Sequence, residues 1–178
     1  MEIVEIIAEV LKYALPAAIV LLVVRYMNDA RLEQERLSSG LDVRKEILRT
    51  HLPLKLAAYE RAVLYLERIN PHNLLARVGS AGKPAQQFHF ELVREIRMEY
   101  EHNLVQQIYI STKGWAALVK AKEEILTVIN QSNRETAEDA DAMTLGRKIL
   151  EKYSHAPHDP SVYAINALKE DIEALFHV

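Results

Sequence analysis

One Glu-x-x-His motif is the clearest candidate for chemistry in this sequence. It joins Glu99 to His102, and Glu95 lies about one helical turn before it. Helical bundles that hold two metal ions use two such motifs and two further glutamates. Of the seven histidines, His102 alone has an acidic residue three positions before it. Because half of the pattern is missing, we predict no metal site and no cofactor, and name Glu95, Glu99 and His102 as the candidate ligands.

Other sequence patterns that carry chemistry are missing. The chain has no cysteine, which excludes disulfides, thiolate metal sites and a cysteine nucleophile. No serine stands in a nucleophile elbow, and no glycine-rich phosphate loop is present. His155 and His158 lie beside Asp159 in a predicted loop, where a solvated surface is a commoner role than a metal site. We therefore expect a protein that is not an enzyme.

Three polar residues fall on predicted apolar faces. Asn103 and Gln107 lie in the apolar arc of a helix predicted over 85–110, and Lys122 projects from the apolar face of the next helix. A buried amide without a partner costs about 1–3 kcal/mol, so we expect Asn103 and Gln107 to bond to neighbouring helices. Lys122 can reach solvent along its own stem, or pair with an acidic residue such as Glu99.

A helix predicted over 53–69 has a charged arc opposite a wide apolar face. We consider this arc as a docking surface, although a solvated face is the usual role of such residues. Its members are Glu60, Arg61, Glu67 and Arg68. The net charge of −3 leaves too little clustered positive charge for phosphate contacts. We therefore predict no nucleic-acid partner.

The elements that would position these residues begin with an apolar segment. Residues 13–24 carry no charge. Because a membrane-crossing helix needs about 20 mostly apolar residues, the span must extend back to Ile6 and include Glu9 and Lys12. We predict one transmembrane helix within an anchor at residues 1–27. A cleaved signal peptide disagrees with the acidic start, whereas a core helix of a bundle remains the alternative because the uncharged run is short.

Charge predicts the orientation of this span. Basic residues gather after it, at Arg25, Arg31, Arg36, Arg44 and Lys45, and only Lys12 and the amino terminus precede them. The positive-inside rule places the basic flank in the cytoplasm. We predict a single-pass protein with its N-terminus outside and its C-terminal domain in the cytoplasm.

The rest of the chain is predicted to be all-α, because glycine is scarce and leucine, alanine and glutamate are abundant. Residues 28–52 form a helical stalk or connector that stops near Gly40 and resumes over 41–48. Residues 53–178 form a bundle of about five helices. Ser111 or Thr112 caps one helix start, and Thr136 and Asp159 open the last two helices.

Two longer motifs resemble a known family. LAAYERAVLYLERINPHNLLAR at residues 56–77 and EYEHNLVQQIYIS at 99–111, followed by Trp115, are similar to small membrane-anchored helical proteins of Bacteroidota that have no assigned activity. The resemblance runs from the anchor through Trp115 and is weaker beyond it. It implies the anchor and the helical body, and it supplies no catalytic residues.

These observations favour a non-enzymatic, membrane-anchored interaction protein. We expect an accessory or scaffold subunit of a bacterial inner-membrane complex, whose partners are the lipid bilayer and either a protein of that complex or a second copy. The alternative is a metal- or small-ligand-binding bundle that uses Glu95, Glu99 and His102, with Lys122 as a further candidate.

Overall fold

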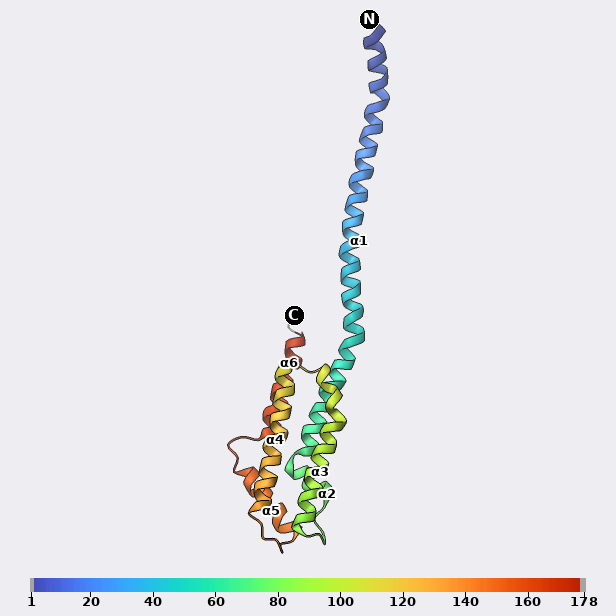
Figure 1. Ribbon diagram of the computed structural model, residues 1–178. Coiled ribbons are helices and arrows are strands. Elements are labelled where there is room, and N and C mark those ends of the chain that lie inside the picture. The colour runs from blue at the N-terminus through green and yellow to red at the C-terminus, as the bar shows by residue number, and fades with distance from the viewer. Residues whose placement is uncertain (1, 177–178) are drawn as a thin grey trace. The chain divides into compact units, whose positions relative to one another are not determined.

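The computed structural model contains helices joined by short connections, and no strand among the residues that it describes (Figure 1). It describes residues 2–176, with side chains at 18–29, 31, 46 and 49–176. The prediction of an all-α fold is confirmed. The elements are α1 (Glu2–Ile69), α2 (Pro71–Val78), α3 (Ala85–Asn103), the short 3₁₀ helix η1 (Leu104–Ile108), α4 (Thr112–Arg134), α5 (Ala142–Ser154) and α6 (Pro160–Phe176).

Helix α1 continues through the positions where the sequence predicted breaks. The predicted stop near Gly40, the separate helix over 41–48 and the new start at Pro53 are wrong. A glycine inside a helix costs only about 1 kcal/mol and a proline about 3 kcal/mol, and the residues around both are mostly good helix formers. Contacts nevertheless divide the chain into two units, Met1–Leu52 and Pro53–Val178, so their boundary falls at Pro53.

No helix among the described residues is long and apolar enough to cross a membrane. The side chains of residues 2–17, which include most of the predicted span, and those of most of the predicted stalk lie outside the described set. The side chains of residues 19–24 are described, and each of these apolar groups is between 47% and 67% exposed. The transmembrane helix stays a prediction.

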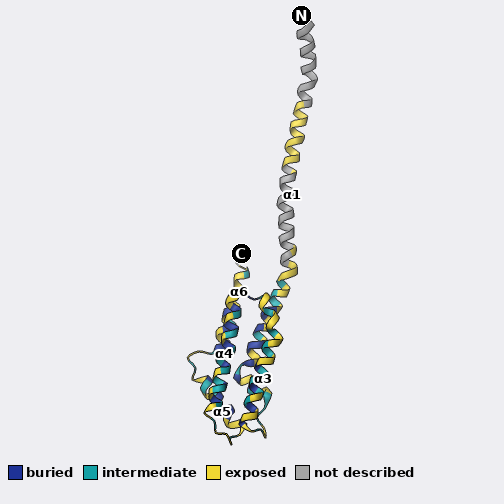
Figure 2. Cartoon of the chain, in the orientation of Figure 1, coloured by how far each residue is buried: buried dark blue, intermediate teal, exposed yellow. Residues whose placement is uncertain are grey.

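Within the unit Pro53–Val178, the last part of α1 runs beside α3 (Figure 1). The Tyr59 hydroxyl of α1 donates to Asp171 Oδ2 of α6 at 3.5 Å. Helix α4 packs against α3, α5 and α6, while the short helix α2 packs against α3 and α5. Apolar residues spaced by three or four positions put one stripe of each helix into the core, and the buried residues of Figure 2 gather inside the bundle. The largest fully buried side chains are Tyr59, Tyr65, Leu66, Ile69, Leu74, Phe88, Leu92, Ile96, Leu118, Ile125, Ile129 and Leu145.

Two predicted helix starts are confirmed by their caps. The Ser111 hydroxyl accepts a hydrogen bond from the Gly114 amide at 2.9 Å. Asp159 Oδ1 accepts from the amides of Ser161 at 2.8 Å and Val162 at 3.2 Å. Each cap satisfies donors that the first turn of a helix otherwise leaves unpaired.

The start of α5 differs from the prediction. Thr136 does not open the helix, because its hydroxyl donates to the Ser132 carbonyl at 2.7 Å, beside the end of α4. Asp141 is the cap instead, and its Oδ1 accepts from the Thr144 amide at 2.8 Å. The next amide, that of Ala142, donates to the Lys83 carbonyl at 3.0 Å, which ties this start to the loop before α3.

The end of α3 also differs. The predicted helix over 85–110 stops at Asn103, and η1 takes over. A 3₁₀ helix turns about 120° per residue where an α-helix turns 100°, so the apolar arc predicted from the α-helical period is lost. Leu104 and Ile108 are 39% and 69% exposed, and Gln107 is exposed too. The prediction of a buried Gln107 is therefore wrong.

Candidate functional site

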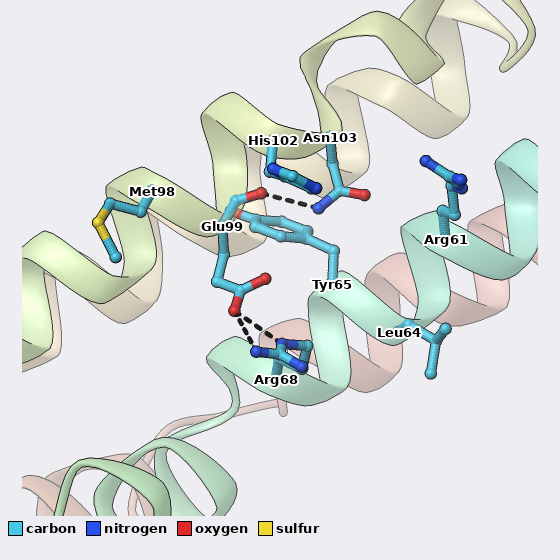
Figure 3. A pocket seen from close by; sticks show the side chains of 8 residues that line it. All are labelled: Arg61, Leu64, Tyr65, Arg68, Met98, Glu99, His102 and Asn103. Atoms are coloured by element: carbon cyan, nitrogen blue, oxygen red, sulfur yellow. Dashed lines mark hydrogen bonds and ion pairs between the residues drawn. The ribbon is translucent and has the colours of Figure 1, made fainter.

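A hollow of about 500 Å³ lies between α1 and α3 (Figure 3). It brings two residues of the predicted docking surface together with two of the predicted metal candidates. It is lined by Arg61, Leu64, Tyr65, Arg68, Met98, Glu99, His102 and Asn103. Helix α1 supplies the first four side chains and α3 the last four, so the packing of these two helices sets the geometry of the site.

Guanidinium groups hold both carboxylates of the predicted metal set. Glu99 Oε1 accepts from Arg68 Nε at 2.7 Å and lies 3.8 Å from Arg77 Nη1 (Arg68 is drawn in Figure 3). Arg77 also pairs with Glu95 Oε2 at 2.6 Å. Among the described side chains, no three histidine or acidic groups come together as metal ligands would. The arginines repel a divalent cation, so this arrangement suits a link between helices better than a metal site.

The three residues predicted as a buried polar network make no hydrogen bond to one another among the described side chains, and each has its own surroundings. Asn103 is half-buried, and its amide donates to the Glu99 carbonyl of its own helix at 2.8 Å (Figure 3). The predicted bond from Asn103 to a neighbouring helix is wrong, because its side chain turns back onto the backbone of its own helix. Gln107 is exposed in η1, as described above.

Lys122 pairs with an acidic residue, as one of the two predicted alternatives had it, but its partner is Glu123 and not Glu99. Its Nζ lies 4.1 Å from the centroid of the Tyr100 ring and 2.8 Å from Glu123 Oε1, and its side chain is 14% exposed. An ammonium over an aromatic face is attracted by about 0.5–2 kcal/mol. The Tyr100 ring also lies 6.0 Å from that of Trp115, which extends the cluster along α4.

Tyr65 forms the floor of the hollow. Its ring reaches from α1 towards Glu99 and Asn103 (Figure 3), and the side chain is 1% exposed. Its hydroxyl finds no hydrogen-bond partner among the described residues. Burial, with a smaller contribution from the nearby Tyr100, raises the pKa of Tyr65 well above its usual range. The floor is therefore neutral and apolar, and the charges lie at the rim.

A second hollow of about 380 Å³ adjoins the first on the outer face of α3. It is lined by His89, Phe90, Val93, Arg94, Arg97, Met98 and Glu101. Met98 lines both hollows. Phe90 and Met98 each lie two positions after a buried residue of α3, which places them about 200° away, on the outer face. This helical phase is readable from the sequence and places both side chains on the surface.

The predicted docking residues of α1 are all exposed. Arg61 and Arg68 line the first hollow, and Arg68 is engaged by Glu99. The Glu67 carbonyl accepts from Asn73 Nδ2 at 2.9 Å, so the backbone of Glu67 also supports the turn into α2. Glu60 and Arg61 make no ion pair with any residue in the described part of the chain.

The loop that contains His155 and His158 does not gather them at one point. His158 Nε2 lies 3.4 Å from Glu124 Oε2, whereas His155 Nδ1 lies 2.7 Å from the Glu151 carbonyl. Asp159 caps α6 and accepts from the Tyr153 hydroxyl at 2.6 Å. These contacts hold the loop to α4 and α5, which is a structural role.

The chain matches the sequence pattern of a family of unknown function, DUF7935, over residues 5–175. The chain belongs to DUF7935. The expected membership in a family without assigned activity is confirmed. No curated protein and no solved structure matches it. Because the DUF7935 match includes residues on both sides of Pro53, the first part of α1 and the bundle belong to one family sequence.

The arrangement in this DUF7935 chain suits binding. An apolar floor with arginines at its rim can hold a carboxylate or another anionic group, because guanidinium donors match such groups in shape and charge. Catalysis by proton transfer needs an acid or base aimed at a reacting group. His102 is the one histidine among the lining residues, and its side chain is exposed to solvent instead of being aimed into an enclosed site.

Proposed function

We propose that this member of DUF7935 is a non-enzymatic interaction protein anchored in a bacterial inner membrane by the N-terminal part of α1. The N-terminus lies outside, and the bundle lies in the cytoplasm. There it acts as an accessory or scaffold subunit that docks on a protein of a membrane complex or on a second copy.

The observation that carries this proposal is the exposure of residues 19–24. Six consecutive apolar side chains, each between 47% and 67% exposed, point in every direction around the helix axis. Covering them stabilises the protein by roughly 5–10 kcal/mol in total, because a large apolar side chain gains about 1.5–3 kcal/mol on full burial. A helix that is apolar all round needs a cover on every side. Lipid provides that cover.

The distribution of charge supports the orientation. Arg25 and Arg31 follow the apolar segment directly and are exposed, and further basic residues follow them. Placing this flank in the cytoplasm agrees with the positive-inside rule. The site between α1 and α3 then faces cytoplasmic partners, and its open shape suits a protein surface better than an enclosed substrate.

Membrane fractionation with carbonate extraction tests the anchor. We expect the full-length chain to stay in the membrane pellet. Replacing Leu15 and Ala18 by arginine puts two charges near the middle of the predicted span over 6–24, at about 2.5–3.5 kcal/mol each, and we expect a shift into the soluble fraction.

Arginines at Val162 and Ala174 are the matched control, because both are exposed on α6 and the added charge is the same. The control should stay in the pellet. If the unmodified chain washes off with carbonate, the anchor is disproved and protein must cover residues 19–24.

One observation favours the alternative of a ligand-binding bundle. The hollow of about 500 Å³ falls in the size range of small-molecule sites. The arginines that hold Glu95 and Glu99 count against a metal, and Lys122 is engaged by Tyr100. A stoichiometric metal in the purified chain that is lost on His102→Ala would favour this alternative over the interaction protein.

A further inference from the structure

The outer faces of α1 and α3 meet in a surface with the composition of a protein interface. Its centre is apolar: Phe90, Leu64 and Met98 are 64%, 60% and 47% exposed. Its rim is charged. We name it the Met98 face, and its exposed charged members are Glu60, Arg61, Glu67, Arg68, Arg94, Arg97 and Glu101. Aromatic residues, methionine and arginine are enriched at protein interfaces, with an apolar centre and a polar rim.

The relief of the Met98 face fits a copy of itself. Met98 is a ridge between the two hollows of about 500 and 380 Å³. In a pair related by a two-fold axis, both copies use the same surface patch, and a residue on the axis lies beside the same residue of the other copy. A ridge flanked by hollows can therefore pack beside the same ridge, with the exposed Phe90 of each copy entering a hollow of the other.

The charges of the Met98 face distinguish a second copy from other partners. Of its four exposed arginines, Arg68 is paired with Glu99, and the other three are matched by three exposed glutamates, so neither sign dominates. An anionic membrane or a strongly acidic protein would select a surface of one sign. Arg97 and Glu101 form no ion pair with any residue whose side chain is described, so both are available across an interface. A two-fold axis can bring arginines of one copy to glutamates of the other.

We propose that a second copy of this chain docks on the Met98 face, with the two-fold axis passing close to Met98. This inference rests on the proposed function, because it names the partner of the same interaction surface.

The size of the face explains why the anchor matters. The second hollow begins at His89 and the first ends at Asn103, a length of about 21 Å along α3 at 1.5 Å per residue. With two helices about 10 Å apart, the footprint is roughly 400 Å², about half of what each partner buries in a standard interface. Such a contact is weak in free solution. Two copies anchored in one membrane meet at a much higher effective concentration.

Disulfide crosslinking of the full-length chain in vesicles tests this proposal. The chain has no cysteine, so one introduced cysteine is unique. We expect Met98→Cys to form a disulfide-linked dimer under mild oxidation, because a residue on the axis lies next to its own counterpart. Lys169→Cys, exposed on α6, is the control. The Met98→Cys dimer should form at least about tenfold faster than the control dimer.

A second pair of variants separates specific docking from random collision. In the Met98→Cys chain, Phe90→Ser should slow crosslinking about tenfold, because an aromatic anchor is lost. Phe176→Ser removes a side chain of the same type that is 62% exposed, against 64% for Phe90. It should leave the rate unchanged.

Equal crosslinking at positions 98 and 169, or equal effects of the two serine variants, would overturn the second-copy proposal. Carbonate extraction of the same vesicles reports on the anchor independently. A chain that stays in the membrane but shows no preference for position 98 keeps the proposed anchor and loses the dimer. A chain that washes off loses the anchor, and the ratio of the two crosslinking rates still decides the dimer.

Discussion

Two buried tyrosines show how much a hydroxyl contributes when it has partners. The Tyr153 hydroxyl donates to Asp159 Oδ1 at 2.6 Å and accepts from Asn70 Nδ2 at 3.2 Å. It thereby links the end of α1, α5 and the start of α6. Burial and the bond to Asp159 raise the pKa of Tyr153 above its usual range. The Tyr65 hydroxyl is buried without a partner among the described residues.

Replacing each tyrosine by phenylalanine should therefore give different results. Tyr153→Phe should lower the free energy of unfolding by about 1–2 kcal/mol, because Asn70 and Asp159 each lose a partner. Tyr65→Phe should change it by less than about 0.5 kcal/mol or raise it, since an unpaired buried hydroxyl is removed. Urea denaturation followed by the fluorescence of Trp115, the single tryptophan, measures both. Equal losses would mean that the Tyr65 hydroxyl has a partner such as a buried water.

At the scale of the helix, two glycines differ in whether the surrounding structure has room for a side chain. A Cβ on Gly114, in the first turn of α4, would meet Asp171 Oδ2 at a forbidden distance and would lie 3.1 Å from Leu168 Cδ2. This close approach lets α4 and α6 pack together. A Cβ on Gly146, within α5, would lie 3.7 Å from Phe88 Cε1, which is an ordinary contact.

The same substitution should therefore have opposite signs at the two positions. Gly114→Ala should destabilise the protein by about 1–3 kcal/mol, because a packed interface must open. Gly146→Ala should stabilise it by roughly 0.5–1 kcal/mol, because alanine is the better helix former. Thermal unfolding followed by circular dichroism compares them. A stabilised Gly114→Ala variant would contradict the close packing of α4 on α6.

Local chemistry was predictable where it is decided within one turn. Ser111 and Asp159 were recognised as helix starts because the side chain of each accepts from a backbone amide three or fewer residues further along the chain. The start of α5 was not, since the Asp141 cap is supported by the bond of Ala142 to Lys83, far away in the sequence. The end of α3 was missed because the change to a 3₁₀ helix follows from packing rather than composition.

The candidate site was only partly predictable for a related reason. The sequence named Arg61, Arg68, Glu99 and His102, and the structure brings all four to one hollow. The pairing of Glu95 and Glu99 with Arg77 depends on how α2 packs on α3, and no spacing along one helix reveals it. The exposed Phe90 and Met98 were detectable from their helical phase.

At the scale of the whole molecule, three carboxylates with lowered pKa values hold the connections around α5 and the loop before α3. The hydrogen bond from Lys83 lowers the pKa of Glu91, and that from Lys152 lowers the pKa of Glu135. The Thr144 hydrogen bonds lower the pKa of Asp141. Together these bonds fasten the loop before α3, the end of α4 and the start of α5.

These pKa shifts determine whether the stability of the fold rises or falls as the solution becomes acidic. A carboxylate with a lowered pKa in the folded state stabilises the fold fully above its ordinary pKa of about 4, and loses this effect as the pH falls through the folded value. Burial raises the pKa values of Tyr59, Tyr65 and Tyr153. The unfolded chain then loses these protons first, so stability falls as the pH rises above about 10.

We therefore expect the urea midpoint to be highest between about pH 5 and pH 9 and to fall on both sides. Glu135→Gln should flatten the acid side, because the amide cannot take up a proton there. Tyr65→Phe should flatten the alkaline side for the same reason, and its hydroxyl has no described partner to lose. Hydrogen exchange at pH 3 should show α5 opening before α6, since the weakened bonds surround α5. A midpoint that stays constant down to pH 3 would show that these carboxylates keep ordinary pKa values in the folded chain.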